Sequence, residues 1–182
     1  MLYEISAPFS KELLSTLKAG DTVKINGTIY TARDAAHKKM IEMIQNGTPL
    51  PFEVNGQAIY YVGPCPAREG EIIGSAGPTT SSRMDAYAPK LIELGLSIMI
   101  GKGLRNSGVI DAMKQYTAVY LGAIGGAGAL ISDCITSQEI IAFPELGAEA
   151  LRKLTVKDFE TVVIIDSYGN NLYEEGRKKF AK

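Results

Sequence analysis

The middle of the chain alternates short apolar segments with segments of helical periodicity, and this alternation restricts the fold more than any other feature. Residues 58–62, 96–100 and 118–121 each predict a strand, because they are short, mostly apolar runs bounded by glycine or polar residues. Between them, residues 84–92 and 109–114 carry apolar side chains at helical spacing. This order of strands and helices is typical of an α/β architecture built in layers.

Signals for hairpins and for a further helix flank this middle region. Residues 22–25 and 28–31 alternate apolar and polar side chains around Asn26-Gly27, the pair that a type I′ hairpin turn prefers. Residues 34–45 predict a helix with one apolar face. The remaining predicted elements are a helix capped by Ser10 that ends at Gly20, strands at 71–75 and 139–143, and a second hairpin of residues 159–165 and 171–173 that turns at 168–170. Together they predict one α/β domain over residues 1–182, layered as β/β/α with a mixed sheet and flanking helices.

Charge and residue counts exclude several classes of function. The 19 Lys and Arg residues against 20 Asp and Glu residues give a net charge of -1, too little positive charge to hold a nucleic acid or an anionic membrane. The sequence has one His and two Cys residues, Cys65 and Cys134, which lie far apart. It therefore predicts neither a His-rich metal site nor a self-contained zinc or iron–sulfur site in this chain. Any bound anion is expected to be held by a few local cations.

No segment predicts export or membrane insertion. The sequence starts with Met-Leu-Tyr-Glu, without the basic stretch and apolar run of a signal peptide. The longest apolar runs are too short to cross a bilayer. We therefore expect a cytoplasmic protein.

The most informative segment is residues 77–85, which reads Gly-Pro-Thr-Thr-Ser-Ser-Arg-Met-Asp. It follows a predicted strand and opens a predicted helix, whose first turn offers free backbone N–H groups to an anion. Thr79 and Thr80 begin a run of four hydroxyl side chains that adds further donors. The alternative is an ordinary helix cap, for which one hydroxyl is enough. Arg83 in the first turn opposes the helix dipole, which makes it a candidate for a functional role.

Two further cations occupy similar junctions between a strand and a helix. Arg33 precedes the predicted helix 34–45, where its alternative role is a surface ion pair with Asp34. Lys102 stands between two glycines directly after the predicted strand 96–100, where its alternative role is that of a solvated turn residue. Two Arg and one Lys suit a small dicarboxylate, because Arg binds carboxylates through two donors. His37 is either an acid–base group or a packing residue.

These motifs resemble the signatures of class I, iron–sulfur fumarases and L(+)-tartrate dehydratases. Residues 77–85 resemble the family's Gly-Pro-Thr-Thr-x-x-Arg-Met-Asp signature, with Ser81-Ser82 in place of the usual small pair. Residues 32–37 resemble its Arg-Asp-x-x-His segment, and residues 101–103 its Gly-Lys-Gly turn. The resemblance runs over nearly the whole chain and is to the β subunit, or to the C-terminal domain of single-chain forms. It implies the family's swivelling β/β/α fold.

The resemblance implies a hydro-lyase that adds or removes water across a hydroxy dicarboxylate. A 4Fe–4S cluster in the partner α subunit acts as Lewis acid in this family, and this chain is expected to bind no metal. The family pattern makes Thr79 the base and assigns substrate contacts to Arg33, Arg83 and Lys102, with Thr80 beside them. A threonine needs neighbouring cations to act as a base.

The expected partners follow from the same resemblance. They are the α subunit, in a hetero-oligomer of two α and two β subunits, and a small dicarboxylate; the isolated chain alone is either a monomer or a homodimer. Fumarate and malate are the first expectation for the substrate pair, with tartrate second. The alternative from a different class is a dicarboxylate- or anion-binding module without cluster chemistry.

Overall fold

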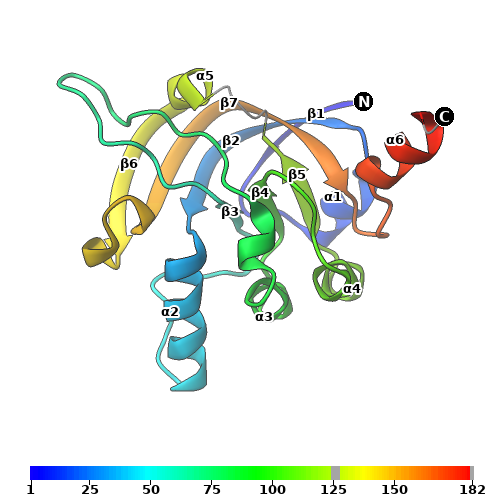
Figure 1. Ribbon diagram of the computed structural model, residues 1–182, viewed down its shortest axis with the longest axis horizontal. Helices are drawn as coiled ribbons and strands as arrows, with labels where there is room; N and C mark the ends of the chain where they lie inside the picture. The colour runs from blue at the N-terminus through cyan, green and yellow to red at the C-terminus, as the bar shows by residue number, and fades with distance from the viewer. Residues whose placement is uncertain (124–127, 181–182) are drawn as a thin grey trace.

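The computed structural model describes residues 1–123 and 128–180, and its strands form one mixed sheet that closes on itself (Figure 1). The strand order is β1-β2-β3-β4-β5-β7-β6, and β2 also pairs with β7, so that β2, β3, β4, β5 and β7 make a five-stranded barrel. The predicted mixed α/β architecture is confirmed. The strands are β1 (Leu2–Ser6), β2 (Thr22–Thr31), β3 (Ala58–Tyr60), β4 (Ile98–Gly101), β5 (Val119–Gly122), β6 (Ile135–Ala142) and β7 (Leu151–Ile165).

Helices cover the barrel from outside, with α2, α3 and α4 along one side of the sheet (Figure 1). Alternate residues of the central strands face opposite ways: Ile98 and Ile100 join the apolar cluster that fills the barrel, whereas Met99 joins the cluster beneath the helices. The helical elements are α1 (Lys11–Thr16), α2 (Asp34–Gln45), η1 (Ser81–Met84), α3 (Ala88–Glu93), α4 (Ser107–Tyr116), α5 (Gly128–Asp133), η2 (Pro144–Glu149) and α6 (Leu172–Phe180). Within the described residues, no helix has both the length and the apolar character needed to span a membrane.

Elements with strong periodicity are confirmed. The helix predicted at 34–45 has the same bounds as α2, and the predicted central strands correspond to β3, β4 and β5. Ser10 caps α1 by accepting the backbone N–H of Leu13 at 3.2 Å. The helix predicted at 84–92 is divided: η1 ends at Met84, and α3 begins at Ala88 with Pro89 in its first turn.

The first predicted hairpin is wrong, because residues 22–31 form one continuous strand. Both halves of β2 pair with the long strand β7, and the register shifts between Ile25 and Gly27. Asn26-Gly27 therefore lies inside β2, opposite a bulge in β7, where Asn26 alone faces Lys157 and Asp158. Gly27 has φ +88°, and Asn26 Oδ1 accepts the N–H of Asp158 at 2.8 Å. The pair can stay within a strand because glycine takes a positive φ without strain.

Two other predicted strands are wrong. Residues 71–75 belong to an irregular segment, in which the N–H of Cys65 donates to the carbonyl of Ser75 at 2.9 Å. The turn at 168–170 exists and is held by Asp166, whose Oδ1 accepts the N–H groups of Tyr168 and Asn170. The strand predicted at 171–173 is the second wrong one: in the described residues this segment makes a single bridge to β7, at Asn171, and α6 begins at Leu172. Strand β1 and helices α5 and α6 were not predicted from the sequence.

Candidate active site

The candidate site lies where four parallel strands end. β2 is parallel to β3, β3 to β4, and β4 to β5, so their carboxyl ends meet at one rim of the barrel. Arg33 follows β2, and Lys102 directly follows β4. In α/β sheets, ligands bind outside the carboxyl ends of parallel strands. The rim therefore brings together segments that are distant in the sequence.

The segment Gly77–Asp85, called here the signature loop, inserts between the ends of β3 and β4. The N–H of Thr79 donates to the carbonyl of Tyr61 at 2.8 Å. Thr80 makes an isolated parallel bridge with Lys102, whose carbonyl accepts the N–H of Ser81 at 2.9 Å. The backbone thus places Thr79 and Thr80 beside Lys102, three of the residues that the sequence predicted for the site.

The helix that was expected to begin in this loop is much shorter than predicted. It is the single 3-10 turn η1, and Thr80 at its N-cap position makes no side-chain hydrogen bond to it. An ordinary helix cap therefore does not explain the hydroxyl run. Arg83 is exposed in η1, and η1 packs against α2, which begins next to Arg33. Among the described residues, neither Arg83 nor Lys102 forms an ion pair.

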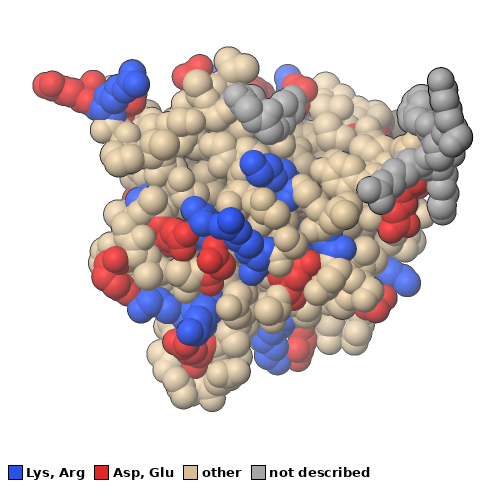
Figure 2. Space-filling view, viewed as in Figure 1, with Lys and Arg blue, Asp and Glu red and all other residues tan. Residues whose placement is uncertain are grey.

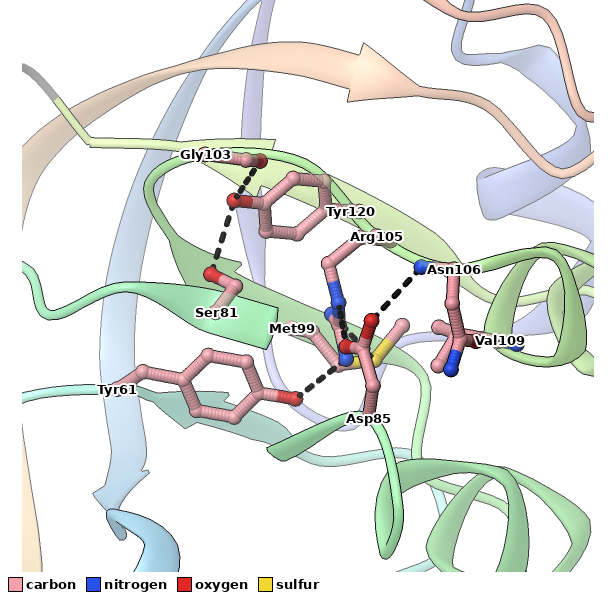
Figure 3. Close-up of polar contacts among 9 residues, drawn as sticks. All are labelled: Tyr61, Ser81, Asp85, Met99, Gly103, Arg105, Asn106, Val109 and Tyr120. Carbon is pink, nitrogen blue, oxygen red and sulfur yellow. Dashed lines mark hydrogen bonds and ion pairs between the residues drawn. The ribbon is translucent and has the colours of Figure 1, made fainter. Parts of the chain in front are cut away.

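A buried ion pair fixes the two loops of the rim to each other (Figure 3). Arg105 Nε donates to Asp85 Oδ1 at 2.7 Å, and the backbone N–H of Asn106 donates to Asp85 Oδ2 at 2.7 Å. The Arg105 side chain is completely buried between the rings of Tyr61 and Tyr120, whose centroids lie 5.3 and 5.1 Å from its Cζ. The pair connects the end of the signature loop to the loop that carries Lys102.

A second polar chain runs through the Ser81 hydroxyl. Tyr120 donates its only hydroxyl proton to the carbonyl of Gly103 at 3.0 Å, so Ser81 is the donor in its 2.9 Å contact with Tyr120 (Figure 3). Gly101 leaves the room for this contact, since a Cβ there would lie 2.1 Å from Ser81 Oγ. Of the two serines that follow Thr80, Ser81 is thus a buried link, and Ser82 is exposed.

Arg33 stands at the N-cap position of α2 and is bound by an acid. Its Nη2 lies 2.8 Å from Oε1 of Glu149, whereas Asp34 Oδ1 is 3.7 Å from its Nε. The predicted pairing with Asp34 is therefore the weaker of two contacts. A Cβ at Gly63 would lie 3.1 Å from Arg33 Cδ, so the glycine after β3 lets the Arg side chain approach. Arg33 shares the rim with the signature loop. Figure 2 shows Lys and Arg side chains gathered near the middle of the face in view, with Asp and Glu side chains beside them.

His37 lies one turn into α2 and is completely buried. Its Nδ1–H donates to the carbonyl of Arg33 at 2.8 Å, and its ring meets that of Tyr61 edge-on at 5.3 Å. Burial lowers the pKa of His37 to about 4, so the ring is neutral at neutral pH. This geometry favours the packing role over the acid–base role, because the ring holds the turn that carries Arg33 and has no exposed surface.

Sequence reasoning missed the residues that support the site. Asp85 is the last residue of the motif 77–85, but nothing in the sequence pattern showed that it binds Arg105. Tyr61 and Tyr120 read only as apolar strand positions, and Glu149 carried no signal at all. Their partners come from other parts of the chain, so only the folded structure shows them.

The described residues contain no group of three or more His, Cys, Asp or Glu side chains placed to hold a metal ion. The two cysteines of the sequence, Cys65 and Cys134, are both free thiols, the first exposed and the second partly buried. A 4Fe–4S cluster needs more thiolates than this chain has, so these residues do not fit the cluster.

The candidate site is thus the barrel rim of an α/β domain, where hydroxyls and cations gather at the ends of parallel strands. Comparisons with known proteins place this chain in a family. The chain belongs to the fumarase C-terminus family, whose model matches residues 3–176. It is 42% identical to fumarate hydratase 2 of Leishmania major over 94% of this chain, and 41% identical to the aerobic class I fumarate hydratase of Escherichia coli strain K12 over 91%. It spans 31% of the length of each of these two relatives.

A third relative has nearly the length of this chain. The putative L(+)-tartrate dehydratase subunit beta of Methanocaldococcus jannaschii is 39% identical over 93% of this chain and 90% of its own length. The resemblance stated from the motifs is therefore confirmed at the level of the family.

Replacing Asp85 with Asn should destabilise the fold strongly, because it leaves the Arg105 charge buried without a counter-ion. We expect a loss of about 3–5 kcal/mol in the free energy of unfolding, measured by urea denaturation. Asp111→Asn, on the exposed face of α4, is the matched control and should change stability by less than about 0.5 kcal/mol. Similar losses in the two variants would contradict the assigned role of the ion pair.

The buried His37 should make stability depend on pH. The unfolded chain takes up a proton at this ring below pH 6.5, whereas the folded chain does so only below about 4. The unfolded state therefore binds more protons in this window, and the free energy of unfolding falls as the pH is lowered. At pH 5 the contribution of His37 should be a loss of about 2 kcal/mol.

Urea unfolding of the wild type and of His37→Gln at pH 7 and pH 5 measures this contribution. The glutamine variant should lose less stability than the wild type between the two pH values, whatever its stability at pH 7. An equal loss in both proteins would show that His37 does not titrate in this way.

Proposed function

We propose that this chain is the β subunit of an iron–sulfur-dependent hydro-lyase that reversibly hydrates fumarate to malate, or dehydrates L(+)-tartrate. The observation that carries the proposal is the bridge between Thr80 and Lys102, which sets the hydroxyl run beside a cation at the barrel rim. Family membership supports the reaction class, and the match to a protein named as a β subunit supports the division into two chains.

In this proposal Thr79 removes a proton from the carbon next to the one that carries the leaving hydroxyl. Among the described residues, none forms a hydrogen bond with its side-chain hydroxyl, so Oγ1 is available to a substrate. Lys102 and Arg83, both without an acidic partner in the described part, would stabilise the alkoxide and the carboxylate that gains charge. Arg33 would bind a substrate carboxylate, and Thr80 would donate to it.

The cluster belongs to the partner in this proposal. When bound there, a 4Fe–4S cluster supplies a Lewis acid for the substrate hydroxyl. The β chain contributes the base and the cations at the rim. Assembly with an α subunit into a hetero-oligomer of two α and two β subunits, the swivelling of this β/β/α domain against its partner, and the cytoplasmic location remain predictions.

Reconstitution tests the proposal directly. The purified chain should show no cluster absorbance and no hydratase activity with fumarate, malate or L(+)-tartrate. Addition of a cysteine-bearing α-type subunit should produce activity on one of these pairs, which also identifies the substrate. Full activity of the isolated chain would refute the proposal. Dicarboxylate binding without turnover in the complex would favour the alternative of a binding module.

Thr79→Ala separates a base from a structural residue. Loss of a general base should lower kcat of the reconstituted complex by about 10²- to 10⁴-fold, while KM stays nearly constant because the cations remain. Steady-state kinetics and a thermal melt of the same samples give the two readouts. A lower Tm with near-normal kcat would refute the role of Thr79 as base.

Arg83→Lys is the companion variant in the same assay. A lysine keeps the charge but cannot form two parallel hydrogen bonds to a carboxylate, so KM should rise more than kcat falls. If Thr79→Ala mainly raised KM and Arg83→Lys mainly lowered kcat, the proposed roles of Thr79 and Arg83 would be refuted.

A further inference from the structure

The arginine that the proposed function assigns to a substrate carboxylate is already bound by a carboxylate of its own chain. Nη2 of Arg33 lies 2.8 Å from Oε1 of Glu149, the last residue of η2. The two side chains are 22% and 24% exposed, so the contact lies at the surface of the rim and solutes can reach it.

This contact uses only half of the donor edge of the guanidinium. Nε and Nη2 of an arginine point to the same side and together match the two oxygens of one carboxylate. Glu149 occupies Nη2 alone, and Arg33 Nε is buried with no hydrogen-bond partner among the described residues. Asp34 Oδ1 lies 3.7 Å from Nε, which is too far for a hydrogen bond. Within the described residues, Asp34 Oδ1 also has no hydrogen-bond donor.

A buried donor without a partner is unfavourable, so the present state of Arg33 is not its best-bound state. A free carboxylate that replaced Glu149 could approach along the fork and satisfy both Nε and Nη2. Glu149 makes only one of these two contacts.

The segment that carries Glu149 is held by other contacts. Lys39 of α2 pairs with Glu145 at 2.7 Å. Arg152 of β7 donates hydrogen bonds of 3.0–3.2 Å to backbone carbonyls in and just after Pro144–Glu149. Release of Arg33 by the Glu149 side chain therefore leaves the backbone of this segment in place.

We propose that Glu149 is an internal competitor for the substrate. It neutralises Arg33 while the site is empty, and one carboxylate of the dicarboxylate displaces it by taking both Nε and Nη2. The inference rests on the proposed function, because it assumes that Arg33 binds a substrate carboxylate. It makes Glu149 a positioning residue that sets the affinity for dicarboxylates and takes no part in the chemical step.

Calorimetric titration with succinate, a dicarboxylate that cannot undergo the reaction, tests the proposal. Glu149→Gln keeps the shape of the side chain and removes its charge. It should tighten succinate binding by roughly two- to fivefold, the range that a partly exposed ion pair allows. Glu145→Gln, which removes an equal charge from the same segment, is the matched control and should leave the affinity unchanged.

A double-mutant cycle and the kinetics distinguish competition at Arg33 from a general effect. In an Arg33→Ala background the effect of Glu149→Gln should disappear, because the two residues act through one contact. In the reconstituted complex, Glu149→Gln should lower KM and leave kcat unchanged. A residue that merely supports the fold would not produce this pattern.

The titration is made with the chain alone and with the α-type partner. Equal or weaker succinate binding by Glu149→Gln overturns the proposal, as does an equal gain in Glu145→Gln or the absence of succinate binding in both samples. An inactive wild-type complex would refute the proposed function, yet the titration would still decide the role of Glu149, because it does not depend on turnover.

Discussion

The pairing of β7 with both β2 and β5 is the constraint on which the rest of the structure depends. β2 to β5 are mutually parallel, and without β7 they would form an open sheet with β2 and β5 at opposite edges. The antiparallel β7 joins these edges and closes the barrel. Closure brings the loops after the parallel strands to one rim, and those loops carry the candidate site.

Loops at a rim need further contacts to keep a fixed geometry, and the Asp85–Arg105 pair supplies them. Burying two charges is costly, and it is tolerated when the ions are close and their remaining polar atoms are bonded. Here both oxygens of Asp85 accept hydrogen bonds, and Arg105 lies between two tyrosine rings. One motif thus has two parts: its threonines lie beside Lys102 at the rim, whereas its last residue, Asp85, holds the loop in place.

The charge balance of the chain is consistent with this arrangement. With a net charge of -1, the protein has no broad positive field, so the binding of any anion would depend on a few placed cations. Lys102 and Arg83 stand at the rim without an acidic partner in the described residues, whereas Arg33 is paired with Glu149. The three cations are therefore not equivalent, and the difference arises from what packs around each.

The sequence by itself determined the strongly periodic elements, such as α2 and the buried strands β3 to β5, and the residues of the signature loop. Those signals are local: apolar spacing, capping residues and a contiguous motif. The tertiary structure decided what Asn26-Gly27 became, since pairing with β7 on both sides kept the pair inside one continuous strand. It also decided which residues support the site. Asp85 and Arg105 are 20 positions apart, and Arg33 and Glu149 are far more distant, so no local pattern records either pair. Ion pairs between distant segments depend on the tertiary structure, because the fold is what brings their backbones within reach.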